Sequence, residues 1–445
     1  MKTKTYPKYR SEDVGFEGEL PAHWTAKRLK FVGALRMSNV DKKSVDGQKD
    51  VDLCNYVDVY KNERITSGME FMPATATKQQ IERFGLRRGD VLLTKDSETP
   101  DDIAVPAVVD EDLGGVLCGY HLAMVRPKKH HDGRYLARAI SARGLREQFY
   151  IEALGVTRFG LGYNAIGCAR LPAPPPDEQR RIADFLDRET ERLDGLIAEK
   201  EKLIGLLEEK RKAAISEAVT KGLNPNAKMR NAGVPWLEEI PAHWKLTRLK
   251  FLSHIRYGLG QPPPLREDGL PFVRATNVFR GRIAEDGMIR IDPDMLPLAR
   301  DPLLKTNDII VVRSGAYTGD SAIIPPEYNG AASGYDMVVR ANHRANPHFL
   351  AWSLLSVSVL THQIDLCRIR AAQPHLNAEE LGDCLLTEPP LAEQEQISIE
   401  IGARFSAIDK AQESMRTAAA LLLERRAALV AAAVTGQIDV REEML

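Results

Sequence analysis

The chain has 445 residues, of which 43% are hydrophobic and 28% are charged, and its formal net charge is −1. This composition is typical of a soluble globular protein with about two to four domains. No apolar run approaches the roughly 18 residues of a membrane span, and the N-terminal MKTKTYPKYR lacks the apolar core of a signal peptide. The cysteines are odd in number and never spaced CxxC, so we expect reduced thiols in a cytoplasmic protein, with neither a disulfide framework nor a metal site: residues 54, 118, 168, 367 and 384.

Two motifs in the first part of the chain return in the second part. LPAHWTAKRLKFV (20–32) returns as IPAHWKLTRLKFL (240–252). GDVLLTKDSETPDDIAV (89–105) resembles NDIIVVRSGAYTGDSAI (307–323), at a slightly shorter separation along the chain. Such repeats predict two copies of one scaffold whose loops have diverged. The tryptophan of the first motif is expected to anchor the entry into each copy, with the histidine beside it as a hydrogen-bonded structural residue.

Strands and then a helix are predicted within each copy. In the first copy, VLLT (91–94) and VPAVV (105–109) have the apolar, β-branched composition of strands, and residues 135–153 have the pattern of a helix. In the second copy, IIVV (309–312) and YDMVV (335–339) are the corresponding strand predictions, followed by a helix over residues 348–364. The expected fold class is therefore mixed α/β (α+β).

A third motif opens a long helix in each half of the chain. PPPDEQRRI (174–182) resembles PPLAEQEQI (389–397), and this register continues without a gap to AVTKG (218–222) against AVTGQ (433–437). The proline-free stretch 178–220 predicts a helix of about 43 residues, with acids in its first turn and a glycine after its end.

Apolar residues recur every seven positions in both long helices, which is typical of helices that pack lengthwise on each other. Lys200 interrupts the first series, and Ala214 ends it. The predicted packing seam comprises Leu186, Leu193, Leu207, Ile401, Ile408, Met415, Leu422 and Leu429.

Chain order predicts how these parts are arranged. The second globular block follows the end of the first helix and precedes the start of the second, so a compact block requires these two helix ends to be neighbours. We therefore predict an antiparallel coiled coil that separates two globular domains in a pseudo-two-fold repeat, with the chain termini near each other. The predicted domains are 1–173, the spacer helix 174–224, 225–387 and the C-terminal spacer helix 388–445.

The sequence contains none of several common catalytic motifs, which favours a binding protein over an enzyme. There is no GxxxxGK[ST] loop, no GxGxxG between a strand and a helix, no HExxH and no Asn/Asp-Pro-Pro-aromatic tetrapeptide. We therefore expect no catalytic residues, no bound cofactor and no metal in this chain.

Two similar domains at a fixed spacing match the geometry by which half-sites are read on duplex DNA. The predicted domain stretches 1–171 and 223–386 carry net charges of +4 and +1, a weak but consistent preference for DNA. The expected readers are the loops after the matched strands (94–102 and 313–320) and the loops before the long helices (157–164 and 368–377), because Arg favours guanine edges and Ser or Thr bonds bases or phosphates. The candidate DNA-binding residues are Thr94, Lys95, Ser97, Thr99, Arg158, Tyr163, Asn164, Arg313, Ser314, Tyr317, Thr318, Arg368, Arg370 and Gln373.

The chain resembles the DNA specificity subunits of type I restriction–modification systems. IPAHWKLTRLKF, GDVLLTKDS and PPxxEQxxI with its terminal AVTKG or AVTGQI carry the resemblance, and the doubled set covers nearly the whole chain. The resemblance implies two target-recognition domains, each reading half of an asymmetric bipartite DNA site. It also implies a non-catalytic subunit whose long helices bind two modification (adenine methyltransferase) subunits, with restriction (translocase and nuclease) subunits joining. S-adenosylmethionine and ATP would then be bound by those partners.

Two alternatives remain open from the sequence. One is a protein-tethering scaffold whose two modules bind peptides, which would lack the steep salt dependence of DNA binding. The other is the specificity domain of a fused restriction–methylation enzyme, which would modify DNA without further subunits.

Overall fold

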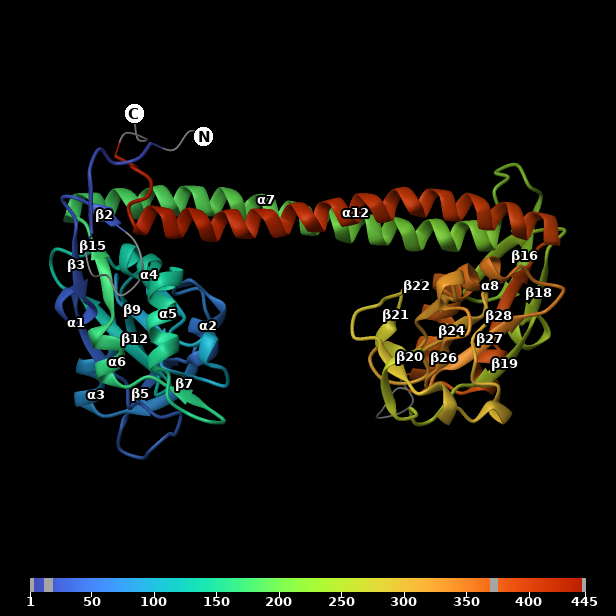
Figure 1. Cartoon of the computed structure of the whole chain (residues 1–445), viewed down its shortest axis with the longest axis horizontal. Coiled ribbons are helices and arrows are strands. Elements are labelled where there is room, and N and C mark those ends of the chain that lie inside the picture. The colour runs from blue at the N-terminus through green and yellow to red at the C-terminus, as the bar shows by residue number, and fades with distance from the viewer. Residues whose placement is uncertain (1–3, 12–18, 369–374, 442–445) are drawn as a thin grey trace. The chain divides into compact units, whose positions relative to one another are not determined.

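The structure is a computed structural model that describes residues 4–11, 19–368 and 375–441. The chain divides into two compact units, and each combines an α/β body with parts of two long helices (Figure 1). Unit 1 comprises Met1–Glu199 and Ala418–Leu445, and unit 2 comprises Lys200–Thr417. The mixed α/β fold class is confirmed, whereas the four predicted domain boundaries stay a prediction.

A five-stranded sheet forms the centre of the body of unit 1. Its strand order is β4 (Gly33–Met37), β13 (Leu122–Pro127), β9 (Val91–Thr94), β11 (Pro106–Val109) and β6 (Arg64–Ile65). All pairs are antiparallel except β11 with β6. Alternate residues of β9 belong to two hydrophobic cores, one on each face of the sheet, which explains the unbroken apolar run that predicted this strand.

The other elements of this body cover the central sheet. A second sheet has the order β7 (Met72–Ala76), β5 (Lys49–Cys54), β12 (Leu113–Cys118) and β8 (Gly85–Leu86). Three two-stranded pairs are β1 (Tyr9–Ser11) with β2 (Glu19–Pro21), β3 (Thr25–Arg28) with β15 (Arg170–Ala173), and β10 (Asp96–Ser97) with β14 (Phe159–Gly160). The helices are α1 (Leu29–Val32), α2 (Tyr56–Lys61), α3 (Lys78–Phe84), η1 (Pro100–Asp102), α4 (Gly133–Ser141), α5 (Arg143–Glu152) and α6 (Tyr163–Cys168).

Unit 2 repeats the central sheet with the order β19 (Ser253–Tyr257), β27 (Met337–Ala341), β24 (Ile309–Val311) and β25 (Ser321–Ile323). These strands match β4, β13, β9 and β11 of unit 1. Its remaining strands are β16 (Met229–Val234), β17 (Leu237–Pro241), β18 (Lys245–Arg248), β20 (Leu265–Val273), β21 (Val278–Phe279), β22 (Arg282–Ile283), β23 (Ile289–Ile291), β26 (Ala332–Ser333) and β28 (Leu385–Glu388). Its helices are η2 (Leu249–Phe251), η3 (Ala275–Asn277), η4 (Pro293–Met295), η5 (Leu298–Arg300), η6 (Pro326–Tyr328), α8 (Pro347–Leu354), α9 (Val357–Val359), η7 (Leu360–Ile364), α10 (Asp365–Arg368) and α11 (Ala378–Gly382).

Each late helix that the sequence predicted as one segment is interrupted. In unit 1 the chain turns at Ala142, which is extended (φ −68°, ψ 145°) and buried, so that residues 135–153 form parts of α4 and α5. In unit 2 the break falls at Ser356, whose hydroxyl donates to the carbonyl of Ser353 at 2.6 Å. A serine hydroxyl that bonds the nearby backbone competes with continuation of the helix. The apolar periodicity of this stretch gives no sign of that hydrogen bond, so the sequence predicted one unbroken helix.

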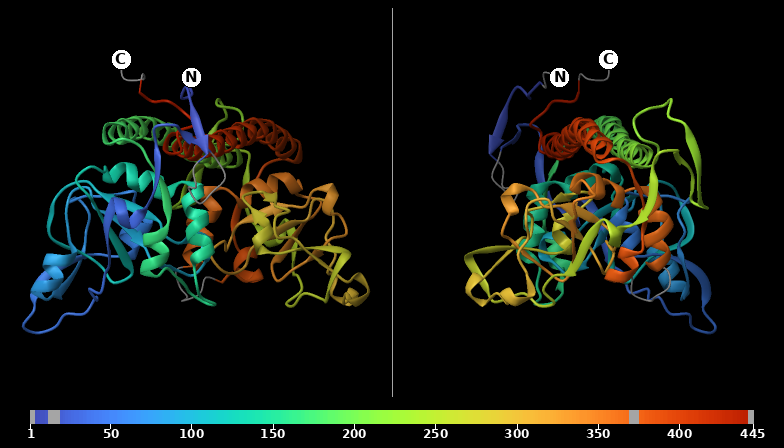
Figure 2. Two further views of the ribbon diagram at one scale, coloured as in Figure 1. Left: turned by 60° about the vertical axis from the view of Figure 1, so that its left-hand side comes forward. Right: turned by 90° about the vertical axis from the view of Figure 1, so that its right-hand side faces the viewer.

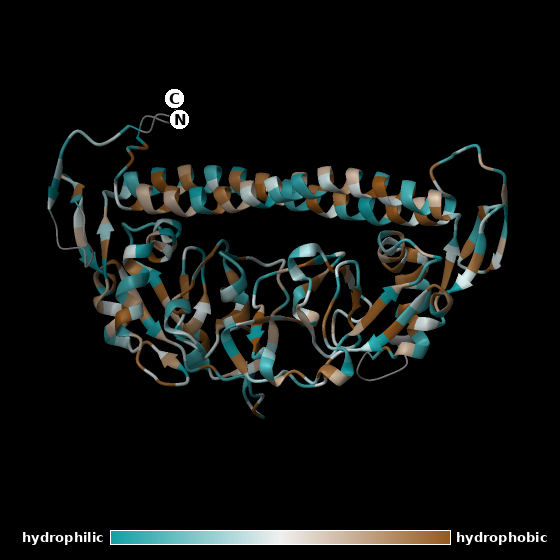
Figure 3. Cartoon of the chain, turned by 45° about the vertical axis from the view of Figure 1, so that its right-hand side comes forward, coloured by the Kyte–Doolittle hydropathy of each residue, from teal (hydrophilic) through white to brown (hydrophobic). Residues whose placement is uncertain are grey.

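The two long helices are α7 (Pro176–Lys221) and α12 (Leu391–Val434), close to the ranges that the sequence predicted. They lie alongside each other within each unit in the views of Figures 1 and 2. Along both helices, hydrophobic and hydrophilic residues alternate rather than forming an all-apolar surface (Figure 3). Among the described residues, no helix has the combination of length and apolar character that crossing a membrane requires.

Within each unit, the start of one long helix packs against the end of the other. The core of unit 1 joins Leu186 near the start of α7 to Val434 at the end of α12. The corresponding core of unit 2 joins Ile215 near the end of α7 to Ile401 near the start of α12. In both units the same apolar cluster extends from the long helices into the globular body. The helix ends and the body therefore share one hydrophobic core.

The repeated Pro-Ala-His-Trp segment is fastened to the first turn of a long helix. Trp24 and Trp244 are fully buried. His23 Nε2 lies 2.9 Å from a carboxylate oxygen of Glu178, and His243 Nε2 lies 2.7 Å from one of Glu393. In unit 2 the indole N–H of Trp244 also donates to Glu393, at 2.8 Å. The histidine thus has the structural role predicted from the sequence.

The glutamine that follows each of these glutamates holds a different element. Gln179 donates to the carbonyl of Pro174 (2.8 Å) and accepts from the backbone N–H of Asp132 (3.1 Å). Gln394 bonds Pro389 and Asn346 in the same way, at 2.9 and 2.8 Å. Since Asp132 and Asn346 are the N-caps of α4 and α8, the Glu-Gln pair links the body of each unit to its long helix.

The glycines at the helix ends complete these two docking sites. Gly222 (φ +76°) follows α7, and a Cβ at this position would lie 3.0 Å from the ring of Trp244. Gly436 (φ +73°) follows α12, where a Cβ would lie 2.4 Å from Pro21. Positive φ and close packing both require glycine at these two positions. This requirement explains why a glycine recurs just after the end of each long helix.

The Glu393→Ala variant should destabilise unit 2, because it leaves the buried indole N–H of Trp244 without its acceptor. We expect a loss of about 1–3 kcal/mol in the free energy of unfolding. Denaturant titration followed by tryptophan fluorescence measures it. The control is Glu395→Ala, which truncates an exposed glutamate on the same helix; equal losses in the two variants would contradict the docking role.

Candidate nucleic-acid interface

In unit 2, Arg313 lies between two tyrosine rings just after strand β24. Its guanidinium carbon is 4.5 Å from the ring centroid of Tyr257 and 4.3 Å from that of Tyr335. One of its nitrogens donates to Nε2 of His375 at 2.9 Å. Because an arginine can only donate, Nε2 of His375 is the acceptor of this hydrogen bond. Both tyrosines are nearly half exposed, so this cation–aromatic cluster reaches the surface.

The backbone around Arg313 is also fixed. Its N–H donates to the carboxylate of Asp336 (3.2 Å), and its carbonyl accepts from the N–H of Leu376 (2.8 Å). Burial raises the pKa of Asp336, while the nearby Arg313 opposes that shift. A bridge between Ser314 and His375 holds the two predicted reading loops together. Arg313 is therefore presented on a rigid support, which suits recognition of a planar acceptor such as guanine.

Unit 1 has a related cluster at the same place in the sheet. Lys95 follows strand β9, and its Nζ lies 4.4 Å from the ring centroid of Tyr120. That ammonium donates to the carbonyl of Ser38 at 3.1 Å, and burial lowers the pKa of Lys95. The cation of unit 1 is thus more engaged with its own backbone than the cation of unit 2.

Arg158, another candidate from the sequence, joins this cluster from a distant loop. Its guanidinium lies 2.7 Å from Asp96, whose other oxygen lies 2.9 Å from Nδ1 of His121. Pairing of β10 with β14 brings these loops together, in the way that the Ser314–His375 bridge does in unit 2. The side chain of Arg158 is 58% exposed, so its remaining donors face solvent.

The other candidate residues fall into three groups. Buried within the fold are Thr94, Ser97 and Thr318, and the hydroxyls of Thr94 and Thr318 bond nearby backbone. Exposed are Thr99, Tyr163, Asn164 and Tyr317, with Ser314 half-buried. Arg368 ends α10, but its side chain lies outside the described residues, as do Arg370 and Gln373 entirely. Contact of any of these residues with DNA stays a prediction.

The tyrosines of the two clusters were not among the sequence candidates, although a repeat marks two of them. Tyr120 lies in GYHL (119–122) and Tyr335 in GYDM (334–337), two stretches that look alike, so a comparison of the two halves would have drawn attention to both rings. The strand registers nevertheless place Tyr335 at the position of His121, one residue after Tyr120. Tyr257 has no such signal, because its counterpart is Met37, as the strand registers show.

Part of the predicted helix seam is buried, and polar residues complete it. Leu186, Leu193 and Ile401 are almost fully buried, whereas Leu207, Ile408, Met415, Leu422 and Leu429 are half-buried. Gln412, which no apolar repeat predicts, is also buried and donates to the carbonyl of Ile204 at 3.3 Å. Each unit further contains an Arg–Asp pair between the helices, Arg426–Asp194 at 2.8 Å in unit 1 and Arg211–Asp409 at 3.6 Å in unit 2.

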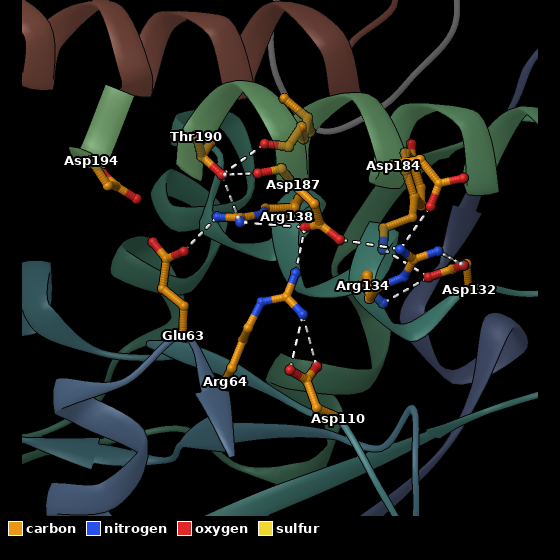
Figure 4. Close-up of polar contacts among 12 residues, drawn as sticks. Glu63, Arg64, Asp110, Asp132, Arg134, Arg138, Asp184, Asp187, Thr190 and Asp194 are labelled. Carbon is orange, nitrogen blue, oxygen red and sulfur yellow. Dashed lines mark hydrogen bonds and ion pairs between the residues drawn. The ribbon is translucent and has the colours of Figure 1, made fainter. Parts of the chain in front are cut away.

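An ion-pair network seats the body of unit 1 on α7 (Figure 4). Arg64 from β6 bonds Asp110 and reaches Asp187 of α7 at 2.7 Å. Arg134 and Arg138 of α4 extend the same network. Arg134 lies 2.7 Å from Asp184, and Arg138 lies 2.6 Å from Glu63 and 3.2 Å from the hydroxyl of Thr190.

Unit 2 uses aromatic packing where unit 1 uses these ions. Alignment of the late helices from their N-caps places Trp352 at the position of Arg138. The register of the long helices places Phe405 at that of Thr190. The rings of Trp352 and Phe405 pack edge to face, with centroids 5.2 Å apart. At this one position the contact between body and long helix is therefore ionic in unit 1 and aromatic in unit 2, although ion pairs of Arg280 with Glu208 and of Arg282 with Asp409 also join the body of unit 2 to the long helices.

Solved structures with this fold come from type I restriction–modification systems. A chain from a structural study of complex assembly and conformational transition of the type I R-M system superposes with a TM-score of 0.69, over 95% of this chain and 100% of that chain, at 17% identity. The HsdS subunit of Thermoanaerobacter tengcongensis superposes with a TM-score of 0.50 over 95% and 99%, at 18% identity. No protein-family model matches the chain.

Curated proteins with similar sequences are specificity subunits of the same systems. The putative type I restriction enzyme MjaX specificity subunit of Methanocaldococcus jannaschii is 23% identical, over 95% of this chain and 96% of its own length. The type I restriction enzyme EcoKI specificity subunit of Escherichia coli K12 is 20% identical, over 95% and 90%. The resemblance to type I specificity subunits that the repeated motifs predicted is thus confirmed along nearly the whole chain.

The Glu63→Gln variant should weaken the seat of unit 1. Burial alone would raise the pKa of Glu63, but Arg426 and Arg138 outweigh it and the net shift is downward. A carboxylate whose pKa is lowered by folding stabilises the protein above its unfolded pKa, about 4.5, and this contribution is lost as the pH falls. We expect a loss of about 1 kcal/mol at pH 7, since Glu63 is half exposed, and a smaller difference near pH 4.

Thermal unfolding of the Glu63→Gln variant and of the unaltered chain at both pH values measures this difference. Glu70→Gln is the control, because Glu70 is an exposed glutamate of the same unit. A gap between Glu63→Gln and the unaltered chain that grows as the pH falls would contradict the assignment.

Proposed function

We propose that this chain is the DNA-reading specificity subunit of a type I restriction–modification complex in the cytoplasm. Each unit supplies one reading surface, and the two surfaces read the two halves of an asymmetric, bipartite site. The chain itself carries out no chemistry. The proposal is supported by the similarity to curated specificity subunits along nearly the full length.

One observation about the molecule carries the proposal: the same place in both units bears a cation against a tyrosine. Lys95 contacts Tyr120, and Arg313 contacts Tyr335. The two cations follow the matched strands β9 and β24. Exposed aromatic rings beside cations suit nucleic acid, because cations bond phosphates or guanine edges while rings contact sugars and bases. The different cations fit two different half-sites.

We further propose that α7 and α12 form one antiparallel coiled coil that spaces the two reading surfaces. Support comes from the local packing inside each unit, where the start of one helix meets the end of the other. A spacer of this kind fixes how many unread base pairs separate the half-sites.

The partners follow from the same proposal. Two modification subunits would dock on the helices, and restriction subunits would join the complex. S-adenosylmethionine and ATP would be bound by those subunits, where adenine methylation and translocation take place.

The Arg313→Ala variant should alter recognition of one half-site only. If Arg313 bonds a base edge, its removal should cost about 1–3 kcal/mol of discrimination at one position. Mapping of methylated bases in cells that express the variant with its modification subunits should show a relaxed or lost half-site. The other half should be unchanged.

Arg300→Ala is the matched control for this experiment, since it truncates an exposed arginine elsewhere in unit 2. It should leave the methylated sequence as it was. Equal loss of both halves in Arg313→Ala would indicate a folding defect and contradict the assigned role.

The Leu193→Asp variant tests the helix pairing. Leu193 is 1% exposed, so a carboxylate there is buried without a partner and should cost about 3 kcal/mol or more. Thermal unfolding and co-purification with the modification subunit measure the effect. Gly195→Asp places the same group two positions away in open space and should be mild; unchanged stability and subunit binding in Leu193→Asp would argue against the coiled coil.

A further inference from the structure

The two Arg–Asp pairs between the long helices have different surroundings. In the register that matches the long helices, Arg426 corresponds to Arg211, and Asp194 corresponds to Asp409. The two pairs are therefore equivalent positions of the repeat. The pair of unit 1 has close contacts of 2.8 and 3.1 Å, whereas Arg211 lies 3.6 Å from Asp409.

A third group completes the pair in unit 1. Both carboxylate oxygens of Glu63 accept from Arg426 at 2.8 Å, and one of them also lies 2.6 Å from Arg138. Glu63 comes from the globular body, just before strand β6. Its carboxylate thus neutralises a guanidinium that faces the body from α12.

The equivalent of Glu63 in unit 2 is Gly281. Arg64 pairs with Val108 in the parallel ladder of unit 1, which puts Glu63 beside Ala107. Gly281 forms a parallel bridge with Ala322, which occupies the place of Ala107 in the matched sheet. A Cβ on Gly281 would lie 3.7 Å from a guanidinium nitrogen of Arg211, so the backbone approaches that arginine without offering a carboxylate.

Arg211 is consequently a poorly satisfied buried cation. Its side chain is 4% exposed, its ion pair with Asp409 is long at 3.6 Å, and its guanidinium carbon lies 5.1 Å from the ring centroid of Phe405. Its Nε makes no hydrogen bond with any residue that the structure describes, which is also true of Nε of Arg426, so what Arg211 lacks is the second carboxylate that Glu63 supplies to Arg426. Asp409 is shared with Arg282 at 3.3 Å. The indole N–H of Trp352 is likewise buried without a hydrogen bond in the described ranges. A buried donor without an acceptor requires an explanation, and an acceptor supplied by a bound ion or ligand is one of them.

A pocket of about 240 Å³ lies at this point of unit 2. Its cations are Arg211, Lys212 and Arg280, and its apolar wall consists of Ile215, Leu355, Val357 and Leu360. Lys212 is exposed. The pocket therefore offers positive charge beside apolar surface.

The pocket also contains three carboxylates, and two of them are used by Arg280. Glu208 forms an ion pair with its guanidinium, and both oxygens of Asp320 accept from its backbone N–H at 3.0 Å. Burial raises the pKa of Asp320, in keeping with a site withdrawn from water. Asp365 is the third. Arg211 and Lys212 are thus the cations that remain for a ligand.

We propose that this pocket binds a small molecule bearing a carboxylate or phosphate group, with the oxyanion on Arg211 and Lys212. The oxyanion takes the place that Glu63 holds in unit 1, and the apolar wall contacts the rest of the molecule. Binding joins α7 to the body of unit 2, as Glu63 joins α12 to the body of unit 1.

Isothermal titration of the full-length chain with inorganic phosphate or acetate, at constant ionic strength set by chloride, tests the proposal. We expect saturable binding of one anion per chain, accompanied by a change in the fluorescence of Trp352. Preference for phosphate or for acetate identifies the chemical class. The absence of saturable binding of either anion would overturn the proposal.

Two pairs of variants locate the site. Arg211→Leu should lower the affinity about tenfold or more, since it removes a charged hydrogen-bond donor. Arg426→Leu alters the equivalent arginine of unit 1 and should leave the affinity unchanged. Lys212→Gln, on an exposed residue that does not endanger folding, should weaken binding by a smaller factor. Equal affinities for Arg211→Leu, Lys212→Gln and the unaltered chain would refute the site.

The Glu63→Gly variant tests the equivalence of the two units. Removing the internal carboxylate leaves Arg426 and Arg138 able to accept an external anion. We expect two anions per chain in this variant, with the second bound in unit 1. A stoichiometry that stays at one would show that Glu63 is not the counterpart of a ligand, and would overturn the proposal.

Discussion

A carboxylate on the first turn of each long helix holds the rest of the structure in place. Glu178 is 5% exposed, so it must be compensated by hydrogen bonds or its burial would oppose folding. His23 and the hydroxyl of Tyr6 supply them in unit 1, and His243 with Trp244 supply them to Glu393 in unit 2. Each carboxylate thereby ties the segment that enters the body to the helix that leaves it.

This constraint explains why three separate motifs recur together while the segments between them change length. The histidine of Pro-Ala-His-Trp bonds the glutamate, and the neighbouring glutamine bonds the N-cap residue of the late helix. The buried tryptophan packs against a glycine at the end of the other long helix, where a side chain would not fit. A change in any one of them leaves a buried polar group unpaired or produces a steric clash. The loops carry no such requirement, so they are where the two halves differ in chemistry.

The sequence predicted the elements that local pattern determines and missed those that depend on contacts between distant segments. Strand 91–94 and both long helices follow from apolar runs and seven-residue periodicity. The breaks at Ala142 and Ser356 do not, because packing and a serine hydroxyl decide them. The buried Gln412 and the Arg–Asp pairs are polar, so the apolar periodicity of the seam does not reveal them.

The candidate site shows the same limit. Lys95 and Arg313 were recognisable because they follow matched strands, but their tyrosine partners come from other strands and loops. Met37 and Tyr257 occupy one position of the sheet, but their side chains differ in kind. The register of the Pro-Ala-His-Trp motif does place Met37 opposite Tyr257 when it is extended by five residues, but a methionine gives no sign that the ring of Tyr257 contacts Arg313, which only the three-dimensional structure shows.

The two proposed reading surfaces therefore differ in how far their cations are already engaged within the protein. Arg313 is held between two rings and bonded to His375, so it loses little conformational freedom on binding and still has donors to offer. Lys95 already donates one of its three N–H groups to the carbonyl of Ser38, so its ammonium is held near that backbone while two donors remain. In unit 1 the exposed guanidinium of Arg158, held by Asp96, is better placed for the role that we propose for Arg313 in unit 2. A scaffold that fixes its frame with buried hydrogen bonds can thus change which cation faces the ligand without altering the fold that presents it.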